Sequence, residues 1–264
     1  MATEETIRSI LIPSRCIERE GVFACSAGIS TGESDPAKRF MRRWPRLYEF
    51  LLWITTNIYF YGLSPEGAIR RAFPDGSQRI ILNLGSGTSD FGAGVINVDL
   101  APFPGVQVVA DAINLPFRDA SLDMIISESL LEHVPRPEKA IEEMRRVLKP
   151  GGFVYIEMPF LHPFHGSPND YTRFTLEGLR QGFAGFRVLD AGARAGPVTT
   201  LVVQLAYILA VLFSFRSWKL YALLAHFFFV ILSPLKIFDQ ISRLFPAYSH
   251  EAANHIYFFA RKEP

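Results

Sequence analysis

The sequence predicts an α/β fold in which a mostly parallel sheet is flanked by helices. Three observations lead to this prediction. Short apolar, β-branched segments recur between residues 80 and 159, glycines or acidic residues follow directly where these segments end, and a helix with one apolar face precedes the last of them. Such apolar segments are typical of strands that are buried on both faces of a parallel sheet.

The first two expected strands enclose a glycine-containing turn, in the stretch ILNLGSGTSDFGAGVINVDL at residues 80–99. Gly85 and Gly87 follow the first strand, and glycines let a chain turn sharply and let a ligand approach the backbone amides. Asp99 ends the second strand, where a carboxylate suits a ribose diol, so the stretch predicts a nucleoside ligand. A dinucleotide is disfavoured because Asp90 replaces the third glycine and the segment is too short for a crossover helix. The alternative that these glycines form a purely structural turn between two strands is not excluded at this point.

The remaining elements continue a regular strand and helix series. A helix is expected from Pro137, with an apolar face and with Glu142 paired to Arg146 one turn away. Gly151 and Gly152 end it. The further strands are expected at residues 106–110, 121–128, 153–159, 186–194 and 254–262.

The segments GSG, DAINLPF, SLDMIISESLLEHV and RVLKPGGFVYIEMP, together with Asp99, resemble class I S-adenosylmethionine-dependent methyltransferases in order and spacing. The likeness runs from about residue 80 to 186 and resumes at NHIYFFARK. It implies a Rossmann-like, seven-stranded, mostly parallel sheet and S-adenosylmethionine as cofactor. The resemblance assigns donor binding to Asn83, Gly85, Ser86, Gly87, Asp99, Leu100, Asp111, Ala112, Ser127 and Glu128.

Two departures from the family pattern bear on this resemblance. Asn83 stands where an acid is common, and the segment 85–99 is shorter than the usual loop and helix. The short form is similar to a subgroup associated with cell-surface glycan or lipid assembly, which indicates a class of acceptor.

Acceptor chemistry is expected in residues 159–175, directly after the fifth strand. Methyl transfer to a hydroxyl is helped by a general base, and the candidates are His162, His165 and Asp170. The candidates for substrate binding are Arg173, which can grip a phosphate or carboxylate, Tyr171 and His133. No metal is expected, because Pro163 interrupts the helix that a His162 and His165 pair would need. Structural roles for these loop residues stay open.

Composition limits the alternatives. A net charge of +1 without a basic stripe argues against a nucleic-acid partner. Cys16 and Cys25 are the only cysteines, which favours a reducing compartment over a disulfide scaffold. Residues 1–40 form an N-terminal extension in which RCIEREGVFACSAG resembles half of a degenerate zinc ribbon, and no signal peptide is indicated.

Two apolar regions lie outside the expected methyltransferase domain, which comprises residues 79–197 and 251–264. Residues 41–78 are expected to form amphipathic lid or packing helices, with arginines 42, 43 and 46 at their start. Residues 198–250 form a hydrophobic helical insertion before the last strand, a hairpin of segments 198–215 and 220–238 separated by RSWK. The hairpin suits a membrane, and buried helices or a homodimer interface are the alternatives.

The sequence as a whole predicts a methyltransferase that acts on a hydrophobic or lipid- or glycan-linked acceptor, by O-methylation, at the cytoplasmic face of a membrane. Its expected partners are this acceptor and the membrane surface. One alternative is a methyltransferase for a soluble small molecule, with the insertion as dimer interface or cap. A second alternative is a non-catalytic membrane scaffold that keeps the fold.

Overall fold

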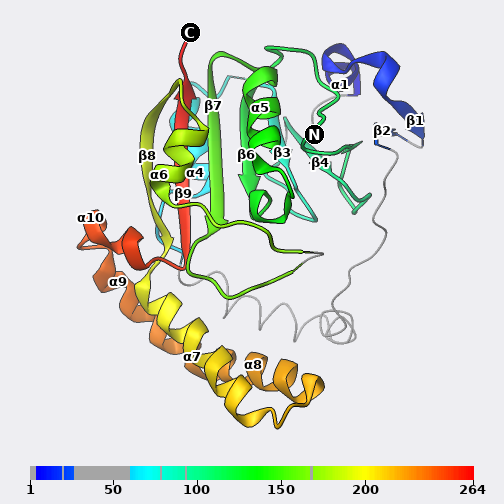
Figure 1. Ribbon diagram of the computed structural model, residues 1–264. Helices are drawn as coiled ribbons and strands as arrows, with labels where there is room; N and C mark the ends of the chain where they lie inside the picture. The colour runs from blue at the N-terminus through cyan, green and yellow to red at the C-terminus, as the bar shows by residue number, and fades with distance from the viewer. Residues whose placement is uncertain (1–3, 20, 27–59, 78, 93, 167–168) are drawn as a thin grey trace.

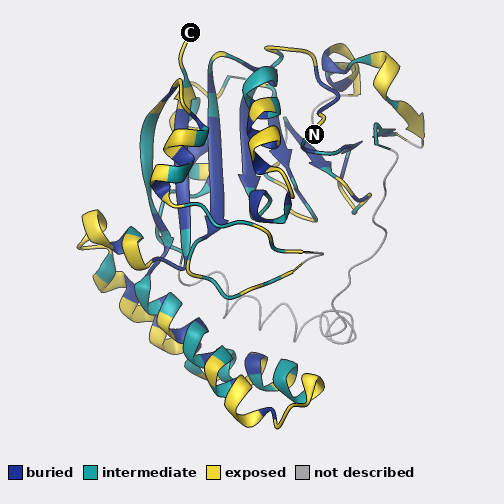
Figure 2. Ribbon diagram, viewed as in Figure 1, coloured by how far each residue is buried: buried dark blue, intermediate teal, exposed yellow. Residues whose placement is uncertain are grey.

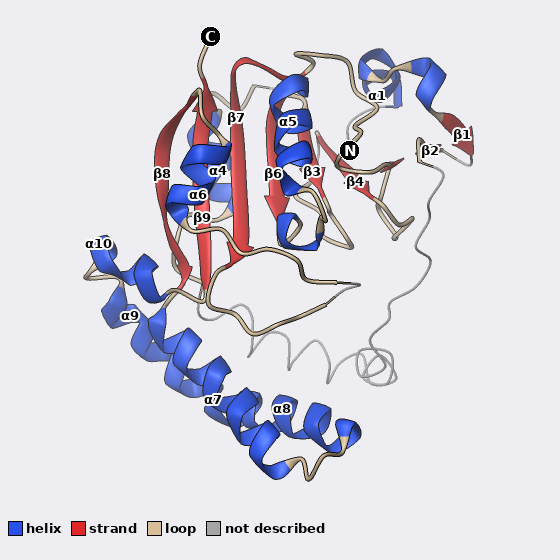
Figure 3. Ribbon diagram, viewed as in Figure 1, coloured by secondary structure: helices blue, strands red, loops and turns tan. Residues whose placement is uncertain are grey.

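The protein is built around one nine-stranded sheet with the order β1-β2-β5-β4-β3-β6-β7-β9-β8 (Figures 1 and 3). The computed structural model describes residues 4–19, 21–26, 60–77, 79–92, 94–166 and 169–264. The strands are β1 (Ile17–Arg19), β2 (Val22–Ala24), β3 (Ile81–Leu84), β4 (Val95–Asp99), β5 (Val108–Val109), β6 (Leu122–Glu128), β7 (Leu148–Pro159), β8 (Phe186–Ala195) and β9 (His255–Lys262).

Seven strands, which lie side by side in the order β5-β4-β3-β6-β7-β9-β8, confirm the predicted sheet. Strands β5, β4, β3, β6 and β7 pair in parallel, and β9 is antiparallel to both β7 and β8. Every residue of β3 is buried, as expected for a strand covered on both faces. Because parallel strands end on the same side, Leu84, Asp99, Glu128 and Pro159 mark one end of the sheet, which we call the C-terminal edge.

Helices cover both faces of this sheet. On one face lie α5 (Pro137–Val147) and α6 (Leu176–Gly182), and α4 (Pro65–Ala72) packs on the other. The buried face of α5 includes Ala140, Ile141, Met144 and Val147, as predicted from its spacing. The predicted ion pair is wrong in detail, because Arg146 contacts Glu143 at 2.7 Å while Glu142 is exposed.

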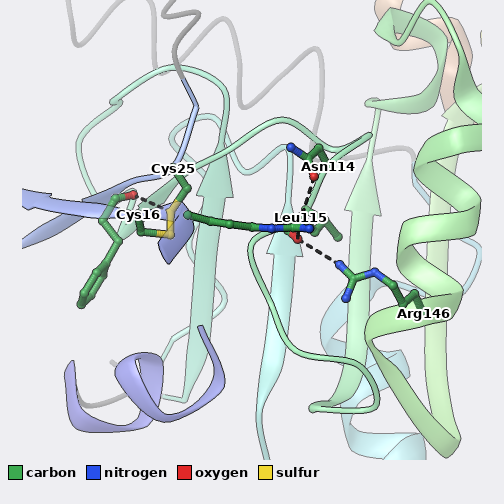
Figure 4. The surroundings of a disulfide bond; sticks show 7 residues. Cys16, Cys25, Asn114, Leu115 and Arg146 are labelled. Atoms are coloured by element: carbon green, nitrogen blue, oxygen red, sulfur yellow. Dashed lines mark hydrogen bonds between the residues drawn. A yellow bond between two sulfur atoms is a disulfide. The ribbon is translucent and has the colours of Figure 1, made fainter. Parts of the chain in front are cut away.

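The N-terminal extension adds two strands that the sequence did not predict. Helix α1 (Glu4–Ile10) precedes the hairpin of β1 and β2, and β2 extends the sheet by pairing with β5. Cys16 and Cys25 flank the paired strands and form a disulfide (Figure 4). The prediction that the two cysteines are unpaired is therefore wrong, because strand pairing brings the two sulfurs together. Neither sulfur is a thiolate that can serve a zinc ribbon.

The extension is also attached to the loop that follows β5. The carbonyl oxygen of Leu115 accepts hydrogen bonds from Arg15 at 3.2 Å and from Arg146 of α5 at 2.9 Å, and the Arg15 guanidinium also donates to Asn114 (Figure 4). The expected helices within residues 41–59 lie outside the described part of the chain.

A pair of apolar helices joins β8 to β9. Helix α7 (Pro197–Phe213) and helix α8 (Trp218–Leu232) form the hairpin, and a 3₁₀ segment (Ser233–Phe238), α9 (Asp239–Ser242) and α10 (Pro246–Ser249) lead back to the sheet. The hairpin runs below the C-terminal edge, away from the helices that cover the sheet (Figure 1). Much of its surface is exposed (Figure 2).

A buried carboxylate fixes the base of this hairpin. Asp239 is fully buried and accepts hydrogen bonds from the backbone amides of Val198 and Thr199, both at 2.8 Å, and from the Thr199 hydroxyl at 2.6 Å. These amides belong to the first turn of α7, whose N–H groups have no partner within the helix. The Asp239 side chain therefore links the start of α7 to α9, in the segment that leads from the hairpin back to the sheet.

Candidate functional site

The glycine turn after β3 has the backbone conformation that the sequence predicted. Gly85 has φ +75° and Gly87 has φ +52°, both in the left-handed region that favours glycine. A Cβ on Gly85 would lie 2.9 Å from the Leu130 side chain, whereas one on Gly87 would meet nothing within 4 Å. The first glycine is thus required by packing, and the second leaves open space beside the backbone.

Asp99 organises this turn from the end of β4. Its two carboxylate oxygens accept hydrogen bonds from the Gly87 amide at 2.8 Å and from the Ala101 amide at 2.9 Å. Each oxygen keeps a second lone pair, so the carboxylate can also accept from a ligand hydroxyl. The intervening residue, Leu100, is exposed. Asp111 follows the neighbouring β5 and accepts from the Ile113 amide at 3.1 Å, which forms the turn that carries the buried Ala112.

Two buried hydroxyl groups lie at the same edge. Ser86 follows β3 and Ser127 lies near the end of the adjacent β6, and both are almost fully buried. Within the part of the chain that the structure describes, neither Oγ atom has a hydrogen-bond partner. Because buried polar atoms are nearly always hydrogen-bonded, these hydroxyls fit a polar ligand bound between the two strand ends.

Asn83 does not take part in this arrangement. Its amide nitrogen donates to the Asn97 side chain at 3.0 Å and to the Ser89 carbonyl at 3.2 Å, so it links β3 to β4 and to the loop. The geometry disfavours the predicted role of Asn83 in donor binding.

A buried charged cluster accompanies Glu128 at the end of β6. Burial, and then the neighbouring Glu157 carboxylate, raise the pKa of Glu128 to about 8. Glu157 forms an ion pair with Arg194 at 2.8 Å, and both side chains are largely buried. The Tyr155 hydroxyl donates to Glu157 at 3.2 Å. Sequence analysis missed Glu157 and Arg194, although a glutamate within the apolar segment FVYIEMPF was a usable signal.

The loop after β7 holds Asp170 in a structural position. Its carboxylate accepts hydrogen bonds from both terminal nitrogens of the Arg173 guanidinium, and it accepts one from the His165 amide at 3.0 Å. Hydrogen bonds from Arg173 lower the pKa of Asp170 to about 2. This geometry disfavours Asp170 as a general base. It also disfavours Arg173 as a binding residue for an anionic substrate, because its guanidinium is already paired with Asp170. Tyr171 is half exposed and accepts a hydrogen bond from Asn169 at 3.0 Å.

Four histidines lie in a row beside this loop. The ring of His165 lies 5.0 Å from that of His133 and 5.1 Å from that of His162, which in turn lies 5.4 Å from His255. Burial lowers the pKa of His162 to about 4, and its Nδ1 is 3.0 Å from the Asn254 side-chain oxygen. The predicted residues His133, His162 and His165 therefore form one cluster, with His165 between the other two.

The donor turn and the histidine cluster are neighbours. Leu130, which packs on Gly85, directly precedes the 3₁₀ turn Leu131–His133. The Tyr171 amide donates to the Glu132 carbonyl at 2.7 Å, which ties the loop after β7 to this turn. Both groups of residues thus occupy the C-terminal edge, where ligands of open α/β sheets bind.

Comparison with known proteins agrees with this geometry. Residues 89–156 match the family described as a methyltransferase domain. An uncharacterized methyltransferase of Mycobacterium leprae is 33% identical over 149 residues, covering 49% of each chain. An uncharacterized methyltransferase of Mycobacterium tuberculosis is 38% identical over 108 residues, 33% of this chain and 42% of that one. A demethylmenaquinone methyltransferase of Paenarthrobacter aurescens is 40% identical over 92 residues, 34% and 36% of the two chains.

Solved structures are related more distantly. Phosphoethanolamine N-methyltransferase 2 of Haemonchus contortus, in complex with S-adenosyl-L-methionine, aligns over 86% of this chain and 60% of its own with a TM-score of 0.47 and 20% identity. The [4+2]-cyclase SpnF aligns over 90% and 99% with a TM-score of 0.45 and 17% identity. At this level of similarity neither structure informs the reaction or the substrate.

The strand order, the turn around Asp99 and the matched segment support a class I S-adenosylmethionine-dependent methyltransferase domain. The chain spans about half the length of the Mycobacterium leprae relative and less of the other two. The association with glycan or lipid assembly is tested by none of these matches and stays a prediction.

Proposed function

We propose that the protein transfers a methyl group from S-adenosylmethionine to a hydroxyl oxygen of a hydrophobic or lipid- or glycan-linked acceptor at the cytoplasmic face of a membrane. The observation that carries the proposal is the shared C-terminal edge, on which the Asp99 turn lies next to the histidine cluster. S-adenosylmethionine supplies the methyl group on a sulfonium that leaves as a neutral thioether.

The donor is assigned to residues whose polar atoms remain available. Asp99 keeps lone pairs for the ribose hydroxyls, and Asp111 lies on the adjacent strand end for the adenine edge. The hydroxyls of Ser86 and Ser127, which have no hydrogen-bond partner among the residues described, suit the polar part of the methionine moiety. The donor carries no phosphate, so the acidic residues of this edge do not repel it.

The acceptor is assigned to the histidine side of the edge. A hydroxyl group must lose its proton as its oxygen bonds to the methyl carbon and the carbon–sulfur bond breaks. A neutral imidazole within reach can accept that proton. His162 and His165 both belong to this side, and Tyr171 exposes a ring against which an apolar acceptor can lie.

Membrane association is supported by the exposed apolar surface of the hairpin. Leu212 is 65% exposed, Phe215 82% and Trp218 74%. Arg216 and Lys219 lie beside them at the tip, a combination typical of membrane-surface helices. Among the described helices, the continuous segment Trp218–Ser242 is long and apolar enough to cross a membrane, and 17% of its most apolar window is buried.

The hairpin also contacts the acceptor side directly. Gln204 of α7 donates to the Leu161 carbonyl at 3.0 Å, one residue before His162. Thr200 of the same helix donates to the Ala252 carbonyl at 2.7 Å, close to Asn254 and His255. A hairpin resting on a bilayer would therefore hold the acceptor loop near that surface.

Donor binding is tested by isothermal titration with S-adenosylmethionine and S-adenosylhomocysteine. Asp99→Asn keeps one acceptor oxygen but loses the charge, so we expect at least about tenfold weaker binding than wild type. Asp119→Asn, at an exposed acid away from the edge, is the matched control. Folded wild-type protein that binds neither ligand would refute the enzyme and favour the non-catalytic scaffold.

Membrane binding is tested by co-sedimentation with phospholipid vesicles. Leu212→Asp places a charge on the exposed face of α7, and we expect it to abolish sedimentation with vesicles. Ile17→Asp, at an exposed apolar residue of β1, should sediment as wild type does. The alternative outcome is that the wild-type protein does not bind vesicles but forms a dimer that Leu212→Asp disrupts. This result would favour the soluble enzyme, with the hairpin as its dimer interface.

A further inference from the structure

A compact group of potential metal ligands lies within the histidine cluster. Glu132 and His133 belong to the turn after β6, and His165 to the loop after β7. Glu132 Oε1 lies 3.7 Å from His133 Nε2 and 3.7 Å from His165 Nε2, and the three residues each offer one ligand atom within 4.8 Å of the others. Ligands held about 2.1 Å from a tetrahedral metal ion are about 3.4 Å apart, so small movements of the side chains would complete such a site.

Glu132 is the strongest sign that a ligand is required here. Its side chain is 0% exposed, and neither carboxylate oxygen has a hydrogen-bond partner among the described residues. Removing an ionised carboxylate from water is costly unless the group is paired or coordinates a metal. The two 3.7 Å separations are too long for hydrogen bonds, so the histidines surround the carboxylate without bonding to it.

The other nitrogen of each imidazole has a polar neighbour. His133 Nδ1 lies 2.5 Å from the Asn169 carbonyl oxygen, so Nδ1 carries a proton and Nε2 offers its lone pair toward Glu132. His165 Nδ1 lies 3.4 Å from the Asp170 carboxylate and 3.5 Å from the Arg173 guanidinium, which are themselves paired. Metal-binding histidines almost always have such an outer partner, which selects the tautomer and the ring orientation.

We propose that Glu132, His133 and His165 bind one divalent transition-metal ion, with Zn²⁺ as the ion that best matches two imidazoles and one carboxylate. Imidazole ligands favour Zn²⁺ and its neighbours over Mg²⁺ or Ca²⁺. Three protein ligands leave a coordination position open, as in catalytic zinc sites. His133 and His165 are 16% and 30% exposed, so the site is accessible from solvent.

The role of the ion rests on the proposed function, whereas its binding does not. An acceptor hydroxyl bound at the open position would lose its proton to solvent more readily, because a metal ion stabilises the negative oxygen. That oxygen would then bond to the methyl carbon while the carbon–sulfur bond breaks, which yields a methyl ether and S-adenosylhomocysteine. In this arrangement His165 acts as a ligand and not as the proton acceptor, and Asp170 lies behind it in an ion pair with Arg173.

The site is tested with untagged, chelator-treated full-length protein titrated with Zn²⁺ against a chromophoric chelator, and with Co²⁺ followed by visible absorption. Wild type should bind one equivalent with Kd below about 1 μM, and Glu132→Gln and His165→Gln should each weaken it at least about 100-fold. His226→Gln, at an exposed histidine of α8, is the matched control. Circular dichroism checks that each variant is folded.

The outcomes separate this inference from the proposed function. Zn²⁺ binding that Glu132→Gln and His165→Gln lose, with Co²⁺ bands typical of nitrogen ligands, supports the site. A wild-type protein that takes up no Zn²⁺, or a folded Glu132→Gln variant that binds it as well as His226→Gln does, overturns it. Titration of the metal-free protein with S-adenosylmethionine is a separate measurement. Failure to bind this donor would refute the proposed enzymatic function, and the conclusion on Zn²⁺ binding would be unaffected.

Discussion

Replacing Glu128 by glutamine is expected to remove a pH-dependent loss of stability from the protein. Burial and the Glu157 carboxylate raise the pKa of Glu128 from 4.5 to about 8. The folded chain therefore keeps this proton at pH values at which the unfolded chain has lost it. Since the unfolded state then binds fewer protons, the free energy of unfolding is highest below pH 4.5 for this group and falls as pH rises toward about 8.

The magnitude follows from the two pKa values. At about 1.4 kcal/mol per pH unit, the interval from 4.5 to about 8 corresponds to a loss of up to about 5 kcal/mol. Glutamine has nearly the same shape and can still donate a hydrogen bond, but it does not ionise. We expect the Glu157–Arg194 ion pair, at 2.8 Å in the wild type, to be kept in the variant.

The assay is urea unfolding followed by far-ultraviolet circular dichroism between about pH 5 and about pH 8. Glu128→Gln should lose less stability than wild type across this range, and the difference between them should grow with pH. Glu142→Gln, at an exposed glutamate of α5, is the control and should follow wild type. Identical pH profiles for wild type and Glu128→Gln would show that Glu128 ionises freely in the folded protein and would refute the reasoning.

Three further changes probe the turn, the hairpin and the histidine cluster. Gly85→Ala should cost about 1–3 kcal/mol and abolish donor binding, because φ is +75° and a Cβ would lie 2.9 Å from Leu130; chemical denaturation and titration calorimetry check this. Asp239→Ala should lower the free energy of unfolding by about 2–4 kcal/mol and increase amide exchange in the first turn of α7, because three hydrogen bonds to its carboxylate are lost. In wild type, the free energy of unfolding should fall by up to about 3 kcal/mol as pH falls from 6.5 toward about 4, because burial lowers the pKa of His162 in the folded state and the unfolded state takes up the proton first. His162→Gln should remove this loss of stability. Unchanged unfolding curves in acid would refute the last of these.

Local patterns were enough to predict seven of the nine strands and the glycine turn after β3. A strand buried on both faces needs uninterrupted apolar residues, as in ILNL of β3, and a turn of left-handed backbone needs glycine, as at Gly85 and Gly87. The position of Asp99 also followed, because an acid at the end of a parallel strand must lie at the C-terminal edge. These features depend on residues close in sequence, so the sequence carries them directly.

The errors concern contacts between side chains, which residue type alone does not indicate. Asp170 was predicted as a base because its type is suitable, but Arg173 and the His165 amide already bond to its oxygens. The cysteines were predicted to be free because there are only two, yet pairing of β1 with β2 joins them. Residue type indicates what a side chain can do, whereas only the fold shows which contacts are already made.

The same distinction separates structural polar groups from those that await a ligand at the C-terminal edge. Glu157 is buried but bonded to Arg194 and Tyr155, so its contribution is to the interior of the fold. Ser127 and Glu132 are equally buried, and their side-chain oxygens have no hydrogen-bond partner among the described residues. Folding such groups without partners costs free energy, which a bound ligand can recover. The donor and the metal ion are therefore assigned to those buried oxygens whose cost the folded chain alone does not offset.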